Sequence, residues 1–596
     1  MHVQKTLQRR AVTMTHGQFR VREVVYVCGQ RCRREGSLVT RRDPALAELI
    51  PPKSTVGYDV MVYVGIERFV GHRQREEICA TLEKEHGIHL SSGEISELCK
   101  RFVMYLEALH RDSAPALRAA LASDGGWPMH IDATCEDGRG TLLVAFAGWR
   151  RWVLGAWKIP TERGDAILPK LKEATAQFGP PCAILRDLGR AVTEAASGLA
   201  NHLGLSIPIL ACHLHFLRDV GKDLLGGGHD KLRNLFRQME LRKHLRGFAR
   251  EQGRLLGTTI DQARESFRSW TPESLASPRL PEGSAGMVAV RSLAQWALDY
   301  AADGNGQDFP FDLPYLHFYV RCLYAAWAVS ALLRNPPADK KVVKAIQKLD
   351  RIFRPINHAV SPLEPVAQTL KERARIFTEL RVALRFTEGK LKGPEANGVG
   401  QTHGARVESA LQALRDIRQS VVNLADSLRQ RRPERGPAKD RRQAIDIVLT
   451  HLERHGKFLW GHAVPMPDQL GGGVRLVDRT NNILEGFFHT MKHGERRRSG
   501  RKNLTQDFER LPLGAALAAN LTRPDYVSIV CGSLDQLPLA FARLDAGDRS
   551  RPQAAISRNG KQSSGMESAS LSAGDRDFVR TKELECYILA AAGCGA

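Results

Sequence analysis

The sequence lacks the features that would place a protein outside a reducing, aqueous compartment. No secretory signal peptide is recognisable at the N-terminus, where Met1-His2-Val3-Gln4-Lys5 leads into mixed polar residues. The 11 cysteines form no regular framework, which argues against a disulfide-built secreted domain. The most apolar run, 313–333, is interrupted by His317 and Arg321 and no second span follows it, so we expect a buried helix. The sequence therefore favours a cytoplasmic protein without a membrane partner.

Acidic residues are also in short supply. There are 65 Asp and Glu against 87 Lys and Arg, which gives a formal net charge of +22 and a pI near 9.7. Such an excess favours a polyanionic partner, and nucleic acid first, because each neutralised phosphate releases counterions. At 596 residues with 43% hydrophobic content, the chain can bury several cores. We therefore expect a multidomain protein that binds a polyanion, most readily nucleic acid.

The N-terminal segment, 1–56, is rich in arginine. Its Cys28-Gly29-Gln30-Arg31-Cys32 motif allows a degenerate zinc-binding segment. No second close pair of Cys or His residues follows, so an ordinary basic segment is the alternative.

The pattern becomes helical over 57–122. Two helices are expected at 59–70 and 73–86, the second closed by Gly87, and the capping box Ser91-Ser92-Gly93-Glu94 opens a third. Helices joined by short turns predict a helix-turn-helix DNA-binding domain. A helical hairpin without a DNA-binding role is the alternative.

From Trp127 the pattern alternates between apolar and polar residues, as strands do. The region 123–225 predicts strands at 129–135, 141–147 and 152–159, a helix at 162–178, a strand at 182–186, a helix at 190–203 and a strand at 207–211. This order predicts the first part of an RNase H-like α/β domain. In that fold Asp132, on the first strand, lies beside Asp187, at the end of the fourth, although 187−132=55 positions separate them.

The remainder of the chain divides into three segments. Residues 226–478 show no convincing strand series and predict an all-helical insertion, with a loop at Gly226-Gly227-Gly228. Residues 479–530 predict the last part of the α/β domain. Residues 531–596 predict a C-terminal tail that is largely disordered, since 547–575 is rich in Ser, Arg and Gly.

A third acid, Glu485, lies on an expected helix over 480–492. Asn481 or Asn482 can cap its start, and its apolar face is formed by Leu484, Phe487, Phe488 and Met491. A basic stretch follows, with Arg496, Arg497, Arg498, Arg501 and Lys502. A carboxylate beside such a stretch suits a metal ion facing a phosphate backbone, whereas a solvated acid on an amphipathic helix is the alternative.

Asp132, Asp187 and Glu485 offer hard oxygen ligands, which suit Mg²⁺ or Mn²⁺ better than zinc. Two such ions, roughly 4 Å apart, can support an in-line phosphodiester displacement. Each acid also has a simpler interpretation, because Asp187 can cap a helix and Asp132 can sit on a polar strand face. Their joint position at one end of the expected sheet favours the metal site.

Several motifs resemble the DDE-type transposases of bacterial insertion sequences, in the broad group related to mutator-like transposases. The resemblance is carried by Met129-His130-Ile131-Asp132, by the segment 183–191 around Asp187, and by Thr480-Asn481-Asn482-Ile483-Leu484-Glu485 with the Lys and Arg residues after it. Cys212 and His215 also resemble the Cys-x-x-His element of the family, for which a structural role is the alternative to a zinc site. Arg186 and Leu188 depart from the family motif.

The resemblance implies a transposase in which Asp132, Asp187 and Glu485 hold two Mg²⁺ or Mn²⁺ ions. It also implies cleavage at a transposon end, followed by attack of the freed 3′-hydroxyl on target DNA. The helix-turn-helix would bind the transposon ends, and the basic stretch 496–502 would hold phosphates. Paired ends imply at least a dimer, acting on double-stranded DNA at the bacterial nucleoid. A catalytically inactive DNA-binding derivative and a structure-specific metal-dependent nuclease are the alternatives.

Overall fold

The computed structural model describes residues 2–30, 32–34, 37–41, 44–256, 284–357, 361–386, 404–436 and 438–547. The chain forms two compact units. The first contains Met1–Ala114, Arg497–Gly500 and Pro512–Ala596, and the second contains Pro115–Arg496 and Arg501–Leu511. Each unit therefore combines segments that are far apart in the sequence.

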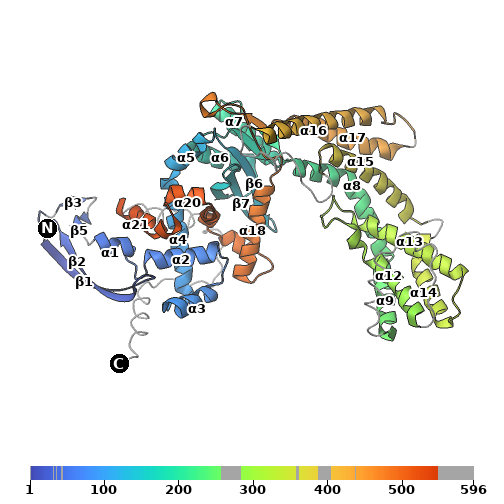
Figure 1. Cartoon of the computed structure of the whole chain (residues 1–596), viewed down its shortest axis with the longest axis horizontal. Coiled ribbons are helices and arrows are strands. Elements are labelled where there is room, and N and C mark those ends of the chain that lie inside the picture. Colours follow the sequence, from blue (N-terminus) through green and yellow to red (C-terminus); the bar gives the residue numbers. More distant parts are fainter. Residues whose placement is uncertain are drawn as a thin grey trace. The chain divides into compact units, whose positions relative to one another are not determined.

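The first unit begins with a long antiparallel β-ribbon. β1 (His2–Thr13) and β2 (Gly17–Val27) lie side by side along their whole length (Figure 1), and the short β5 (Thr40–Arg41) pairs with the end of β2. A separate small hairpin is formed by β3 (Arg33–Arg34) and β4 (Ser37–Leu38). The sequence pattern of 1–56 predicts only a basic segment, so these strands are an addition to that prediction.

One face of the ribbon packs on α1 (Pro44–Leu49). The small core between them contains Ala11, Leu46 and Ile50, flanked by Phe19, Val21 and Leu49. Because successive side chains of a strand point to opposite faces, the other face of the ribbon is left without a packing partner from this core.

The three helices expected in 57–122 are present. They are α2 (Tyr58–Phe69), α3 (Arg75–His86) and α4 (Ser92–Asp112). Gly87 ends α3 with a φ of +62°, and the Ser91 hydroxyl accepts a hydrogen bond from the Glu94 amide at 3.2 Å. The predicted helix ends are therefore confirmed to within about two residues, an uncertainty typical of helix boundaries.

The segment 531–596, which the sequence predicts to be a largely disordered tail, begins with ordered structure. α20 (Pro524–Val530) precedes it, and α21 (Leu537–Gly547) packs in the first unit, where Phe541 stacks on Tyr105. The hydroxyls of Tyr58 and Tyr105 both donate hydrogen bonds to Asp545. The described part of the predicted tail therefore contains an ordered helix, which an apolar face and one carboxylate anchor. The rest of the predicted tail, 548–596, lies outside the described residues.

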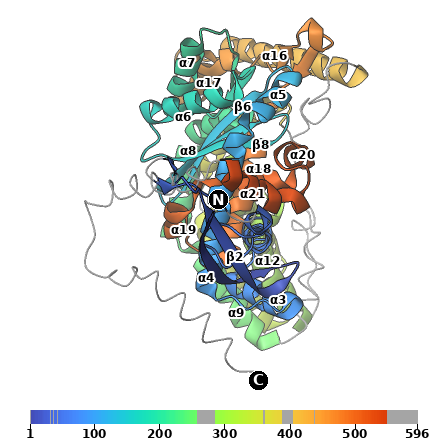
Figure 2. The same cartoon turned by 90° about the vertical axis from the view of Figure 1, so that its left-hand side faces the viewer.

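The second unit contains a mixed five-stranded sheet with the order β10-β9-β6-β7-β8. β6 pairs antiparallel with β7 and parallel with β9, while β7–β8 is antiparallel and β9–β10 is parallel. α6 (Gly164–Phe178) and α7 (Arg190–Leu203) lie side by side next to the sheet (Figure 1, Figure 2). The strands are β6 (Pro128–Glu136), β7 (Arg139–Ala147), β8 (Trp152–Lys158), β9 (Ala183–Arg186) and β10 (Ile209–Ala211), preceded by α5 (Ala114–Ser123). The predicted order of strands and helices is confirmed.

A block of helices follows β10 in the second unit and shares one hydrophobic core. Its helices are α8 (His213–Gln238), α9 (Leu241–Leu256), α12 (Ser284–Leu298), α13 (Pro314–Arg334), α14 (Lys340–Asn357), α15 (Leu363–Ala383), α16 (Ala405–Gln430) and α17 (Lys439–His455). α13 contains the most apolar run; it and the segment Pro524–Ala546 are, among the described residues, long and apolar enough to cross a membrane. Arg321 within α13 is bound to Asp303 at 2.6 Å and much of the helix is buried, as expected for a core helix.

Two features of the segment 226–478 differ from the prediction. The three glycines at 226–228 lie inside α8 rather than in a loop, because the apolar face of that helix continues through them. The segment also ends in a hairpin, β11 (Ala463–Pro465) with β12 (Val474–Leu476), so it is not all-helical. Val464 and Val477 pack against Ala183 and Leu185 of the main sheet. Strands of three residues carry too short a pattern to be recognised in the sequence.

Candidate active site

Strand register brings two carboxylates together. β6 and β9 run parallel with Ile131 opposite Arg186, so the next positions on the two chains are Asp132 and Asp187. Neighbouring strands lie roughly 4.8 Å apart, so these positions are adjacent at the carboxyl end of β9. The backbone amide of Gly189 donates to Asp187 Oδ1 at 3.1 Å. The two aspartates therefore face the same end of the sheet.

Arg186 supports the backbone that presents Asp187. Its side chain is buried, with Nη1 donating to the Asp187 carbonyl oxygen at 2.5 Å and the guanidinium over the Phe458 ring at 4.8 Å from the centroid. Burial lowers the pKa of Arg186 to about 10, while the neighbouring Asp187 raises it. The residue that departs from the family motif is therefore a buried cation beside the second acid.

Asn481 positions the third acid relative to the first. This fully buried side chain donates from Nδ2 to the Ile131 carbonyl at 3.0 Å, and its Oδ1 lies 3.0 Å from His130 Nδ1, which therefore carries the proton of that hydrogen bond. Its carbonyl accepts the Glu485 amide at 2.9 Å, at the start of α18 (Asn482–Ser499). A single asparagine thus connects the residues just before Asp132 to the first turn that carries Glu485.

The electrostatics of Asp132 reflect the nearby acids. Burial, then Asp187, and more weakly Glu485 and Glu162 together raise the pKa of Asp132 to about 8, whereas the Ala133 amide acts to lower it. Burial and then Asp187 likewise raise the pKa of Glu162. Carboxylates that share a site without a compensating cation oppose one another's ionisation. The acids are therefore close enough to interact electrostatically.

Glu485 already has an arginine and a histidine from α8 as neighbours. Arg218 Nη1 donates to its Oε1 at 3.1 Å, and His215 Nε2 lies 3.6 Å from the same oxygen. Among the described residues, no group of three or more His, Cys, Asp or Glu side chains is arranged to hold a metal ion. Asp132, Asp187 and Glu485 therefore interact in pairs but do not form a ready set of ligands with these rotamers.

The chemistry of the donor set fits a hard divalent cation. Asp132, Asp187 and Glu485 supply only oxygen ligands, the type that Mg²⁺ and Mn²⁺ prefer. A cation at this end of the sheet would offset the repulsion that raises the pKa of Asp132. Glu485 would have to exchange its ion pair with Arg218 for the metal.

Within the second unit, two arginines of the basic stretch after Glu485 lie close to protein carboxylates. Arg496 pairs with Glu136 at 3.2 Å, and Arg501 lies 3.6 Å from Asp507 on α19 (Thr505–Arg510). Lys502 is exposed. The cationic groups expected to hold phosphate are thus partly neutralised within the protein.

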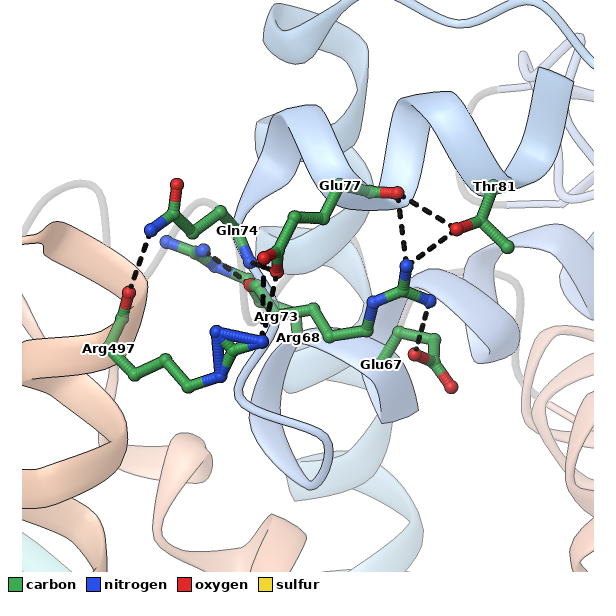
Figure 3. Close-up of polar contacts among 7 residues, drawn as sticks. All are labelled: Glu67, Arg68, Arg73, Gln74, Glu77, Thr81 and Arg497. Carbon is green, nitrogen blue, oxygen red and sulfur yellow. Dashed lines mark hydrogen bonds and ion pairs between the residues drawn. The ribbon is translucent and has the colours of Figure 1, made fainter. Parts of the chain in front are cut away.

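Arg497 and Arg498 belong to the first unit. Figure 3 shows Arg497 beside the start of α3, where its guanidinium lies 3.4 Å from Glu77 and its carbonyl accepts a hydrogen bond from Gln74 Nε2 at 3.1 Å. Arg498 is 9% exposed, with its guanidinium 4.9 Å from the centre of the Phe69 ring. Arg498 therefore contributes to packing in this unit.

Among the described residues, neither candidate zinc motif has the three or more ligands that would hold a metal ion. The thiols of Cys28 and Cys32 lie 3.3 Å apart, and neither joins a metal-binding group of three or more among the residues that the structure describes. Cys212 is fully buried and accepts a hydrogen bond from the Asn481 amide at 3.3 Å. His215 lies next to Glu485, whereas Cys212 contacts Asn481, so the two residues make separate contacts at the carboxylate site.

Sequence reasoning missed two residues of this site. Asn481 appears in the sequence only as a possible helix cap, and its contacts with β6 span 351 and 350 positions. Arg218 lies 267 positions from Glu485, three residues after His215, and only its place on the helix next to the Cys-x-x-His element could have indicated it.

Comparison with solved structures gives a structural likeness. No protein-family model matches the chain, and no curated protein matches its sequence. Among solved structures, the chain is similar to the "Drosophila P element transposase strand transfer complex", with 11% sequence identity and a TM-score of 0.30, covering 80% of this chain and 93% of that one. At this level the likeness assigns no residue a role, so the functional argument rests on the contacts described above.

Proposed function

We propose that the protein is a DDE-type DNA transposase with an RNase H-like catalytic domain. It would bind transposon end DNA and catalyse metal-dependent phosphodiester cleavage and strand transfer. The observation that supports the proposal is that Asp132 and Asp187 occupy adjacent positions at one end of the sheet, with Glu485 close enough to Asp132 to interact with it electrostatically. Parallel register brings the first two together, and the buried side chain of Asn481 brings in the third.

The proposed reaction is two successive displacements at phosphorus. Water attacks the phosphodiester at the transposon end, and the bond to the 3′-oxygen breaks, leaving a 3′-hydroxyl and a 5′-phosphate. That hydroxyl then attacks a target phosphodiester and releases a new 3′-hydroxyl. Two Mg²⁺ or Mn²⁺ ions, held by Asp132, Asp187 and Glu485, would supply activation of the attacking oxygen and stabilisation of the leaving one.

The chain's own residues would orient this chemistry. Asn481 fixes the start of α18 against β6, so that Glu485 stays directed at the site through both displacements. Arg218, 42% exposed beside Glu485, can exchange its carboxylate partner for a DNA phosphate when metal occupies the acids. Joining two transposon ends requires at least two protomers, so the active form is a dimer or larger.

Replacing Glu485 tests the proposal. Glu485→Gln keeps the size and the helix position but removes the charge, so it should retain binding to end DNA. Mg²⁺-dependent cleavage and joining should fall by at least about a thousandfold, because the site loses a negatively charged ligand. The matched control is Glu194→Gln, at an exposed glutamate on α7 that pairs with Arg190. Normal cutting by Glu485→Gln would show that the third acid is assigned wrongly.

One observation favours a second candidate, a DNA-binding derivative without catalysis. The ion pair between Arg218 and Glu485 already neutralises the third acid, and such a pair could be a permanent replacement for the metal. Under this alternative the wild-type protein binds DNA but neither cuts it nor binds Mn²⁺. Mn²⁺ titration of the wild-type chain separates the two candidates.

A further inference from the structure

The exposed face of the β1–β2 ribbon carries an unusual arrangement of charge. In the antiparallel register, Arg10 lies directly opposite Arg20, and Gln8 lies opposite Arg22. Opposite residues and every second residue share a face, so the three arginines are neighbours on one side of the ribbon. Arg20 and Arg22 are exposed and Arg10 is half-buried.

No acid lies on this face. The residues sharing it between the bulge and the turn are Thr6, Gln8, Arg10, Val12, Gln18, Arg20, Arg22 and Val24. Among the described residues, the side chains of Arg10, Arg20 and Arg22 take part in no hydrogen bond or ion pair. Like charges directly opposite each other destabilise a sheet. An arrangement that costs stability in the free protein favours a role in binding an anion.

The opposite face of the same ribbon provides the contrast. Arg9, the neighbour of Arg10, pairs with Glu23 at 3.3 Å, and the Glu23 side chain is only 3% exposed. This face also packs on α1. Neighbouring arginines on one strand therefore differ in environment: Arg9 belongs to the folded interior and Arg10 to the unpaired surface.

The helices of the same unit are less suited to a polyanion. α3 carries Arg75 and Lys84 against four glutamates. On α4, Glu97 lies 3.8 Å from Lys100 and 3.5 Å from Arg101, so those cations are partly neutralised. The expected helix-turn-helix is thus not the most basic surface of the first unit.

We propose that the face bearing Arg10, Arg20 and Arg22 binds the phosphate backbone of double-stranded DNA. A two-stranded ribbon fits the major groove, which is about 12 Å wide, and arginine pairs well with phosphate oxygens. The choice of DNA as the polyanion rests on the proposed function, whereas the location of the surface rests on the charges of the ribbon. Cleavage and binding are measured separately, so failure of one proposal does not imply failure of the other.

The test measures binding of the full chain to a labelled DNA duplex by fluorescence anisotropy over a range of NaCl concentrations. The variant Arg10→Gln/Arg20→Gln should bind on the order of tenfold more weakly. The slope of log affinity against log salt should become shallower by about 1.8, or about 0.9 for each arginine that no longer neutralises a phosphate. Its melting temperature without DNA should be unchanged or higher, because the opposed charges are gone.

Arg9→Gln is the matched control, with the same substitution one position away on the same strand. It should lower the melting temperature, because Glu23 loses an ion-pair partner, and leave the salt slope unchanged. Arg10→Lys/Arg20→Lys should retain the wild-type slope. Unchanged affinity and slope in the double glutamine variant would overturn the proposal, as would tighter wild-type binding to duplex RNA or single-stranded DNA than to duplex DNA.

Discussion

Two arginine-rich regions look alike in the sequence and differ in the folded chain. In the stretch 496–502, Arg496, Arg497 and Arg501 each lie close to a carboxylate, and Arg498 packs on Phe69. On the open face of the β1–β2 ribbon, the arginines have no such partner among the described residues. The region with the denser charge in sequence therefore has less free charge to offer a polyanion.

The difference teaches that pairing, rather than the number of cations, decides which basic surface is available. An arginine already bound to a carboxylate must break that contact before it can bind phosphate, whereas an unpaired arginine must only exchange its counterions. The paired region should thus contribute mainly to stability and the unpaired region mainly to DNA binding.

The strongest test of this comparison is the free energy of unfolding of two variants, Arg498→Ala in the paired region and Arg22→Ala in the unpaired region. Arg498→Ala should reduce the free energy of unfolding by about 2 kcal/mol, because it removes a desolvated stack on Phe69 and the packing of the alkyl chain. Arg22→Ala should change it by less than about 0.5 kcal/mol, since the side chain is exposed. Urea denaturation measures both.

DNA affinity should respond in the reverse order. Arg22→Ala weakens binding and makes the salt slope shallower by about 0.9, whereas Arg498→Ala changes neither. If Arg498→Ala instead kept its stability and weakened DNA binding, the distinction between the two regions would be wrong, and the stretch 496–502 would regain the role that the sequence suggests.

The sequence predicts the main sheet well because its strands are short, largely apolar runs. The alternation in Met129-His130-Ile131-Asp132 and the short apolar strand before Asp187 are local signals, and they suffice to place both aspartates. The ribbon escapes this reasoning because the first residues of β1 are exposed on both sides and therefore show no alternation of apolar residues. The hairpin of β11 and β12 gives too short a pattern.

Pairing of charges is harder to predict, since it depends on long-range contacts. The partner of Glu485 is 267 positions away, and that of Arg497 is 420. The three acids could be proposed from the sequence, but the asparagine that aligns them and the arginine that neutralises one of them could not.

Two buried histidines near Asn481, His130 and His462, are held in the uncharged form by burial, and this gives a pH-dependent test of that region. Burial lowers the pKa of His130 to about 4, against an opposing effect of its bond to Asn481, and burial with nearby Arg479 lowers that of His462 to about 3. The unfolded chain binds these protons near pH 6.5 and the folded chain does not. The contribution of these two histidines to stability should therefore be fully present above pH 6.5 and fall as the pH drops toward 4, by about 1.4 kcal/mol per pH unit for each histidine, whereas Asp132, with its raised pKa, contributes in the opposite direction.

Denaturation of the metal-free chain between pH 7 and pH 5 measures this slope. His462→Leu should reduce it by the contribution of one histidine, whereas replacement of His489, which is exposed on α18, should leave it unchanged. An equal effect of both variants would mean that acid sensitivity does not arise from the histidines around Asn481. The ribbon carries no buried histidine of this kind in its described part, so its DNA binding should not show the same pH dependence below neutrality.

The smallest effect is expected at Glu485, where the ion pair with Arg218 competes with a metal ion for the same carboxylate. Arg218 is the cation closest to Glu485, so it should oppose a divalent ion at the same carboxylate. Arg218→Gln should strengthen Mn²⁺ binding by a few-fold at most, because an ion pair this exposed is worth less than about 1 kcal/mol. Calorimetric titration without DNA measures the affinity, and Lys222→Gln, an exposed substitution further along α8, serves as the control. Weaker Mn²⁺ binding by Arg218→Gln would show that the arginine orients Glu485 for the metal rather than competing with it. Arg218, although paired with a carboxylate, would then contribute directly to metal binding. The rule that paired arginines act in stability and unpaired arginines in function would not hold at the carboxylate site.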